Sequence, residues 1–182
     1  MRKRLLALFC CAALAAPLPA AAAETPVNLA RGKSYTVEKG VDTSHSYALY
    51  AEGGESFDVD GGQLTDGAKD DYYKAFRALS RTVTIDLGAV CSVTGYEAAF
   101  YSTSSSGVYV PRCISMAVSQ DGEQYMTVSQ AARDYSIFGT PNRTSTLGDT
   151  LSSPAAARYV RIEFPVDVFC YISEIEVYGY ET

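Results

Sequence analysis

Apolar side chains recur at every second position in several segments of this chain, and this alternation restricts the fold more than any other feature. Three segments show it clearly, with apolar members Val83, Ile85 and Leu87; Ile114, Met116 and Val118; and Val160, Ile162 and Phe164. A period of two places such residues on one face of a β-strand, whereas an amphipathic helix needs a period near 3.6. Short alternating strands separated by Gly, Ser and Asp turns predict an all-β fold, an antiparallel β-sandwich.

A hairpin turn is predicted at Asp121 and Gly122, between the strand ending near Val118 and the strand beginning near Met126. Asp-Gly is favoured in tight hairpins because glycine readily adopts the positive φ that these turns require.

The last segment breaks the alternation. Ile172 and Ile175 have opposite parity, so both can face the core only if an extra residue is accommodated at Ser173 or Glu174. Such an insertion is a β-bulge, which re-aims side chains and often lies near functional sites. We expect the bulge to turn the Glu174 carboxylate and the Ser173 carbonyl towards one point, and Glu176 to face solvent.

Residues 1–23 have the composition of a secretory signal peptide: a basic start, an apolar run and an alanine-rich end before Glu24. The apolar run is too short to span a bilayer, which takes ~20 apolar residues. Cys10 raises the alternative of lipid attachment, but Phe9 fits poorly before a lipid-bearing cysteine, so simple secretion from a bacterium is favoured. We expect residues 24–182 to form a single extracellular domain.

Without the leader, the chain carries 12 basic and 21 acidic side chains, a net charge of −9. This charge disfavours binding to nucleic acid or to anionic lipid, because both need clustered Lys and Arg. It suits a protein that binds neutral ligands or cations.

Three cysteines remain after the leader: Cys91, Cys113 and Cys170. In an oxidising compartment two of them can pair, and the sequence does not choose among the three pairings. Three buried, reduced cysteines are an equal alternative. Their spacing lacks the paired Cys and His ligands of a zinc site.

Five short motifs appear in a fixed order along the chain. They are Leu64-Thr65-Asp66-Gly67, Thr84-Ile85-Asp86-Leu87-Gly88, Val118-Ser119-Gln120-Asp121-Gly122, Ala157-Arg158-Tyr159-Val160-Arg161-Ile162, and Ile172-Ser173-Glu174-Ile175-Glu176-Val177-Tyr178-Gly179. In this order they resemble the discoidin or coagulation-factor type C superfamily, and most closely its bacterial family 32-like carbohydrate-binding modules. The resemblance covers Asn28 to Tyr180. It implies a galactose-binding-like jelly roll of about eight strands and a lectin-like, non-catalytic carbohydrate-binding function.

Acidic residues crowd one glycine-rich stretch: Asp58, Asp60, Asp66, Asp70 and Asp71. A hard cation such as calcium takes ~6 to 8 oxygen ligands from carboxylates and carbonyls in a tight loop of this kind. The family resemblance implies a structural calcium ion with Asp66 and Glu174 as side-chain ligands. It places carbonyl ligands at Gln63, Ala68 and Ser173, and possible participation at Asp71, where the family more often has Ser or Thr. The alternative is a solvated acidic loop.

Three long segments lack strand patterning: residues 39–63, 102–109 and 130–156. Loops of this length are usually functional or disordered. A sugar site needs aromatic faces and hydrogen-bonding side chains, and the chain has 14 Tyr and no Trp. The predicted ligand-binding residues are His45, Tyr47, Tyr50, Arg77, Tyr109 and Arg112, with Tyr135 and Arg143 as further candidates. For Arg112 the alternative is that it only opens a strand, and Phe76 is expected to fill the core.

Motifs for catalysis are missing from the sequence. It contains no Gly-x-Ser-x-Gly elbow, no His-Glu-x-x-His helix and no glycine-rich phosphate loop. We therefore expect a non-enzymatic protein whose partner is a glycan or polysaccharide, with no nucleic acid and no membrane span. An adhesion module for protein or lipid head groups is the alternative, and a glycan-active enzyme is a weaker one. A non-covalent partner enzyme or cell-surface protein fits a chain without its own catalytic segment.

Overall fold

Two long strands, β4 (Ser80–Ser102) and β7 (Arg143–Pro165), organise the protein. A computed structural model describes residues 24–40, 63–69, 74–77, 80–134 and 143–182, which contain eight strands and two short 3₁₀ helices. The remaining elements are β1 (Val27–Asn28), β2 (Tyr35–Lys39), η3 (Gln63–Thr65), β3 (Lys74–Arg77), η4 (Ser104–Ser106), β5 (Cys113–Ser119), β6 (Met126–Ala132) and β8 (Phe169–Glu181). All strand pairs are antiparallel, so the all-β prediction is confirmed.

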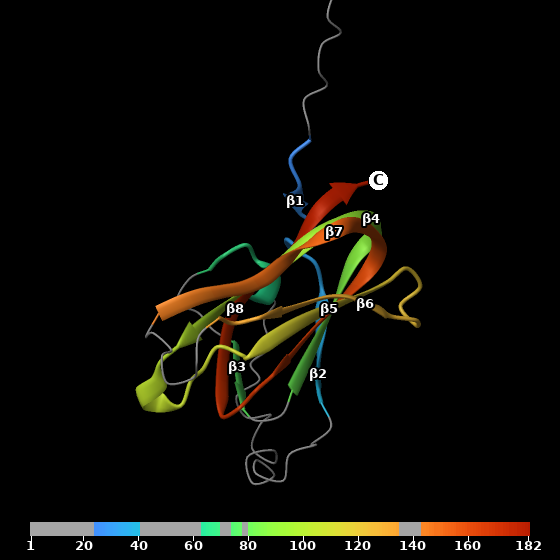
Figure 1. The fold of residues 1–182 in the computed structure, drawn as a ribbon. Coiled ribbons are helices and arrows are strands. Elements are labelled where there is room, and N and C mark those ends of the chain that lie inside the picture. The colour runs from blue at the N-terminus through green and yellow to red at the C-terminus, as the bar shows by residue number, and fades with distance from the viewer. Residues whose placement is uncertain (1–23, 41–62, 70–73, 78–79, 135–142) are drawn as a thin grey trace, which may run out of the picture.

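The strands β4 and β7 form one antiparallel ribbon, from the pair Ser80 and Pro165 to the pair Ser102 and Arg143. Its register shifts between Asp86 and Cys91 and again just after Val93. At these irregularities the ribbon bends and passes from one layer of the sandwich to the other, as Figure 1 shows. A β-bulge bends its strand because the extra residue interrupts the regular ladder.

Each half of the ribbon belongs to a different layer. In the first layer, the start of β4 pairs with β2 and the end of β7 pairs with β5, which in turn pairs with β6. In the second layer, the end of β4 lies between the start of β7 and β8, and β8 also pairs with β1 and β3. The two layers form the sandwich that the alternation predicts.

The two ends of the sandwich differ. The bend of the ribbon, β1 and the C-terminus lie at one end (Figure 1). At the other, the chain between β4 and β5 meets the start of β8: Tyr109 donates its backbone N–H to the Phe169 carbonyl at 3.0 Å, and Phe169 donates to the Gly107 carbonyl at 3.2 Å. We call this second end the loop end.

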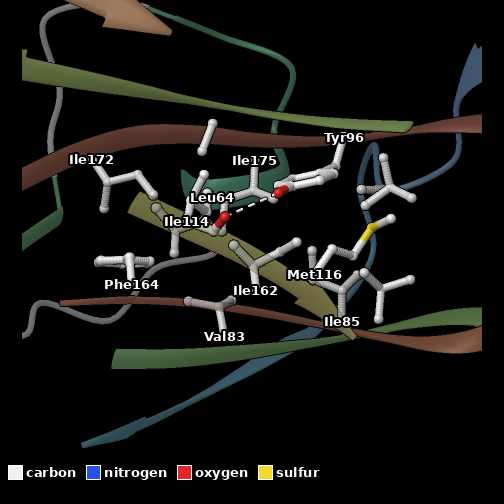
Figure 2. Close-up of a cluster of buried hydrophobic side chains, with 14 of the residues drawn as sticks. Leu64, Val83, Ile85, Tyr96, Ile114, Met116, Ile162, Phe164, Ile172 and Ile175 are labelled. Atoms are coloured by element: carbon white, nitrogen blue, oxygen red, sulfur yellow. Dashed lines mark hydrogen bonds between the residues drawn. The ribbon is translucent and has the colours of Figure 1, made fainter. Parts of the chain in front are cut away.

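The core lies between the layers, and all nine alternating residues named from the sequence are buried in it. Figure 2 shows side chains from both layers in contact. The Phe164 ring packs edge-on against Phe100 at 5.5 Å between centroids and is tilted against Phe76 at 5.9 Å, so Phe76 fills the core as expected. The Tyr96 hydroxyl donates to the Ile114 carbonyl at 3.1 Å, which satisfies the one polar atom of this large buried side chain.

The hairpin prediction is also confirmed. Gly122 has φ of +81° in the turn between β5 and β6. Asp121 stabilises the turn because its Oδ1 accepts hydrogen bonds from Ser119 Oγ and from the backbone N–H groups of Glu123 and Gln124, at 2.8 to 3.0 Å. These donors hold the pKa of Asp121 down at about 2.

The sequence misassigned most of residues 130–156. Strand β6 continues to Ala132, and β7 begins at Arg143. From Arg143 to Thr150, β7 pairs regularly with β4, yet only Leu147 in that stretch is buried. The backbone hydrogen bonds between β7 and β4 do not depend on which side chains β7 carries. A Ser- and Thr-rich strand at the edge of a sheet therefore shows little alternation of apolar and polar residues in its sequence. The segment 102–109 was assigned correctly as a connection, apart from Ser102, and it contains η4.

The three cysteines are all free thiols; Cys91 and Cys170 are buried, whereas Cys113 is partly exposed. Burial raises the pKa of Cys91 and of Cys170. Over the described part of the chain, no helix is long and apolar enough to cross a membrane.

Candidate functional site

The segment 63–69, which contains η3, is fixed to the body of the protein at its first residues. Gly32 donates its N–H to the Thr65 carbonyl at 2.5 Å, and Thr65 Oγ1 donates to the Lys33 carbonyl at 2.7 Å. Leu64 and Thr65 are buried. These contacts place the following residues, Asp66 to Lys69, against β8.

The predicted β-bulge in β8 is confirmed. Glu174 pairs with Ala99 and Ile172 pairs with Phe100, so Ser173 is the extra residue. Ile172 and Ile175 are both fully buried in the core, as the parity argument requires. The bulge therefore lets Glu174 point away from the apolar core, towards the segment 63–69.

Gly67 and Glu174 form the contact between the two elements. The Gly67 N–H donates to Glu174 Oε1 at 3.0 Å. Gly67 has φ of +87°, and a Cβ there would lie 3.0 Å from Arg31 Nε, so both the backbone conformation and the available space favour glycine. Each requirement explains why a Gly follows Asp66 in the first of the five motifs.

Glu174 is a fully buried carboxylate with one unsatisfied oxygen. Its Oε2 has no hydrogen-bond partner among the described residues. Burial raises the pKa of Glu174 to about 8; the Gly67 N–H opposes this shift, and the negative charges of Asp66 and Glu176 add to it. A buried acceptor beside a second carboxylate is a site that a cation would stabilise.

Lys69 occupies the neighbouring position on the outer face of β4 and β8. Its ammonium group pairs with Glu97 at 2.5 Å and with Glu176. The Tyr178 hydroxyl also donates to Glu176 Oε2, at 2.6 Å. The prediction that Glu176 faces solvent is therefore wrong: its side chain is only 15% exposed, because Lys69 and Tyr178 cover it. Although burial lowers the pKa of Lys69, its hydrogen bonds to Glu176 and Glu97 raise it overall.

The structure brings together two parts of the predicted metal set. Gln63, Asp66 and Ala68 lie in the segment 63–69, and Ser173 and Glu174 lie in the bulge. Asp66 Oδ1 accepts the Ala68 N–H at 2.7 Å. Asp58, Asp60, Asp70 and Asp71 lie outside the described residues, and in the part of the chain that is described no group of three or more Asp, Glu, His or Cys side chains converges.

Three of the predicted ligand-binding residues lie at the loop end. Arg77 is the last residue of β3 and pairs with Phe169. Tyr109 is partly exposed, and Arg112 is 66% exposed by its side chain and lies 3.8 Å from Asp167. Arg112 directly precedes β5, as the alternative reading held. The candidate Arg143 is exposed and opens β7 at the same end. His45, Tyr47, Tyr50 and Tyr135 lie outside the described residues.

Sequence reasoning missed a cavity of about 620 Å³ that extends from the loop end along the edge of β7. Val110, Arg133 and Asp134 line it near the loops, and Thr146 to Thr150 line it along β7. No local motif marks these residues, because the cavity forms between strands of different layers.

Residues 41–175 match the F5/8 type C domain family. No curated protein matches the chain.

Several solved structures are similar to the chain. A carbohydrate-binding module of Clostridium perfringens, CpGH89CBM32-6, has 19% sequence identity and a TM-score of 0.51, covering 84% of this chain and 99% of that one. Chitosan-binding module 1 of a Paenibacillus chitosanase/glucanase has 19% identity and a TM-score of 0.54, with 84% and 99% covered. The lectin domain of lectinolysin, solved with Lewis B antigen, has 18% identity and a TM-score of 0.53, with 85% and 97% covered.

Proposed function

We propose that this chain, which belongs to the F5/8 type C domain family, binds carbohydrate at its loop end and does not cleave it. The observation that carries the proposal is the loop end itself. It gathers a partly exposed Tyr109 and an exposed Arg112, both from the connection between β4 and β5, and an exposed Arg143 from the start of β7. A tyrosine ring can stack on the apolar face of a sugar, and guanidinium groups can donate to its hydroxyls.

Similar structures support a glycan ligand. One module of Clostridium perfringens, CpGH89CBM32-5, was solved in complex with GalNAc-β-1,3-galactose, and the lectinolysin domain with Lewis B antigen. Both are saccharides, so a glycan or polysaccharide is the ligand class that we propose for this chain.

We further propose a structural calcium ion held by Asp66 and Glu174, with carbonyl ligands from Gln63, Ala68 and Ser173. Two observations support the fit: the buried Glu174 Oε2, which has no hydrogen-bond partner in the described part of the chain, and the bulge that turns Glu174 towards the segment containing Asp66. A bound calcium would supply positive charge to two carboxylates that otherwise repel each other. It would fix the segment 63–69 on β8 and would take no part in sugar chemistry.

Secretion after removal of residues 1–23 completes the proposal, and a non-covalent partner enzyme or cell-surface protein remains compatible with it. N-terminal sequencing of the protein from the culture medium would test this. A mature chain that starts at Glu24 supports secretion, whereas protein retained in the cell with Met1 intact contradicts it.

A glycan array probed with the purified protein, with calcium present, tests the main proposal. We expect glycan hits with Kd values that change little between low and high salt, because neutral hydroxyls make no screened ion pairs. Each hydrogen bond to a neutral hydroxyl contributes only about 0.5 to 1.5 kcal/mol net, so binding should be weak.

Single substitutions would locate the glycan-binding site on the protein. Tyr109→Ala, Tyr47→Ala and His45→Ala, measured by titration calorimetry, should weaken glycan binding, whereas Tyr125→Ala, on the β5–β6 turn, should not. Binding that survives all three substitutions would move the site away from these residues. Release of reducing sugar by the purified protein would overturn the non-catalytic assignment, and binding to protein or lipid but to no glycan would favour the adhesion alternative.

A further inference from the structure

The outward-facing side of the first layer carries two neighbouring rows of side chains that cross five strands, β2, β4, β7, β5 and β6. None of the residues in these rows is buried, whereas Val83, Met116 and Ile162, which alternate with them along the strands, are fully buried. We call the surface that the two rows form the outer face. One row is Thr36, Thr84, Arg161, Ala117 and Thr127, and the other is Glu38, Thr82, Glu163, Ser115 and Gln130.

Arg161 lies at the centre of the outer face and is held in place by its neighbours. Its Cζ lies 3.6 Å from the centre of the Tyr125 ring, and its Nε donates to Thr84 Oγ1 at 3.4 Å. In the part of the chain that the structure describes, its two terminal nitrogen atoms have no hydrogen-bond acceptor and no carboxylate partner. A guanidinium group fixed by stacking presents its remaining donors in a geometry that suits a carboxylate.

Glu163 is the acidic counterpart of Arg161 at the centre of the outer face. It is exposed, and it forms no ion pair with any residue that the structure describes. It follows Arg161 by two positions on β7, which places the two backbone positions about 7 Å apart on the same side of the strand. A partner that suits this face therefore presents a carboxylate opposite Arg161 and a cation opposite Glu163.

A second copy of the chain meets both requirements. Consider two outer faces in contact across a two-fold axis that lies between them, perpendicular to β7, and crosses β7 at Ile162. Because Arg161 and Glu163 are equally far from Ile162, this rotation places Arg161 of each copy opposite Glu163 of the other. It also places the row that contains Arg161 opposite the row that contains Glu38. Two-fold contacts of this kind use the same patch on both copies and need such self-complementarity.

From these observations we propose that the outer face binds a second copy of this chain, through two reciprocal ion pairs between Arg161 and Glu163. The residues beside this pair in each row are Thr, Ser or Ala, so the two sheets can approach closely. Tyr125 lies next to Arg161 and adds an aromatic contact. Tyrosine and arginine are among the residue types that contribute most to binding at protein interfaces.

The size of the outer face predicts a weak dimer. Five strands spaced about 4.8 Å apart span roughly 24 Å, and seven residues centred on Ile162 span about the same length, so the face covers roughly 600 Å². A standard stable interface buries about 800 Å² on each partner. Each mature copy also carries a net charge of −9, which opposes association. We therefore expect a Kd of roughly 0.1 mM.

This dimer would separate the two loop ends. The rotation reverses the direction of β7, so the loop ends of the two copies point away from each other. If sugar binds at the loop end, the dimer can join two glycans that lie on different surfaces. This consequence rests on the proposed function, whereas the dimer itself does not.

The first test is sedimentation equilibrium of the purified protein without glycan, at concentrations up to about 1 mM, tenfold above the expected Kd. The data should fit an equilibrium between monomer and dimer. A protein that stays monomeric over this range would overturn the proposal, whatever the glycan array shows.

Charge reversal tests which residues form the contact. Arg161→Glu and Glu163→Arg each place like charges opposite one another twice in the dimer, so each should weaken it by about tenfold or more. The controls are Arg143→Glu, at the start of β7, and Glu181→Arg, at the end of β8, which change the net charge by the same amounts at exposed positions away from the outer face. Losses equal in variants and controls, or a dimer that survives both reversals, would contradict the proposed contact.

Mixing the two reversed variants tests the two-fold arrangement. In a mixed dimer, the acidic side chains of Arg161→Glu lie opposite the basic side chains of Glu163→Arg, so both contacts are again between opposite charges. An equimolar mixture should therefore form a mixed dimer with a Kd within about threefold of that of the unmodified protein, as expected for exposed ion pairs. Fluorescence-detected sedimentation with one variant labelled measures it, and circular dichroism shows that each variant is folded. Folded variants that fail to associate when mixed would overturn the reciprocal pairing.

Discussion

The Gly67 N–H donates to Glu174 Oε1 at 3.0 Å, joining residues 107 positions apart in the chain. The contact exists because the bulge at Ser173 turns Glu174 out of the core and because Gly67 adopts a positive φ. It leaves Glu174 Oε2 buried and unsatisfied among the described residues, next to Asp66. Because this one contact organises the proposed calcium site, three of the following predictions concern it.

Calcium should raise the melting temperature of the protein relative to chelator. A ligand that binds only the folded state adds about 2.7 kcal/mol at a hundredfold excess over its Kd. Glu174→Gln should abolish this increment, whereas Glu176→Gln should keep it, because Glu176 serves Lys69 and Tyr178 instead. Scanning calorimetry with and without calcium measures the increment. An increment absent from the unmodified protein, or lost equally in both variants, would rule out this site.

In chelator, stability should fall as pH rises from about 4.5 to about 8. In the folded protein the pKa of Glu174 is raised to about 8, from an ordinary 4.5. Below pH 4.5 Glu174 is protonated in both the folded and the unfolded state, and the folded state does not have to bury its charge. This stabilisation is lost as the pH rises towards and through 8, because the unfolded state ionises first. The contribution is on the order of 5 kcal/mol. Urea unfolding across this pH range should show a smaller fall in the free energy of unfolding for Glu174→Gln. Parallel curves for the two proteins would show that Glu174 ionises normally.

Replacing Gly67 with Ala should destabilise the protein more than replacing Gly32. Both glycines have positive φ, +87° and +70°, so each substitution costs about 1 to 2 kcal/mol of backbone strain. At Gly67 the new methyl group also crowds Arg31, whereas at Gly32 nothing lies within 4 Å. Gly67→Ala should also reduce the calcium increment, because it displaces the segment that carries Asp66. Equal unfolding free energies and equal calcium increments for the two variants would contradict this account.

Tyr96→Phe should lower the free energy of unfolding by about 1 to 3 kcal/mol, because it leaves the buried Ile114 carbonyl without its hydroxyl donor. Tyr125→Phe is the control: it keeps the ring that stacks on the Arg161 guanidinium at 3.6 Å. A surface change of this kind should alter stability by less than about 0.5 kcal/mol. Chemical denaturation of both variants tests the difference, and a Tyr96→Phe protein as stable as the unmodified one would mean that the carbonyl finds another donor.

Features that depend on which face a side chain occupies could be predicted from the sequence. Burial leaves an alternating pattern along each strand, so the strands around Ile85, Met116 and Ile162 were predictable. The change of parity between Ile172 and Ile175 predicted the bulge for the same reason. Asp121 and Gly122 predicted the hairpin because turn geometry is a local property of the backbone.

Features that depend on which segments meet were decided by the tertiary structure. Residues 143–150 form a strand because β4 supplies the backbone ladder, and that pairing leaves little trace in a Ser- and Thr-rich segment. Glu176 is covered because Lys69 reaches it from another segment, which no periodicity encodes. The cavity lined by Asp134 and by Thr146 to Thr150 likewise forms only because β6 and β7 belong to different layers and lie beside each other. Side-chain patterns record burial on a face, whereas long-range pairing depends on backbone groups that every residue shares.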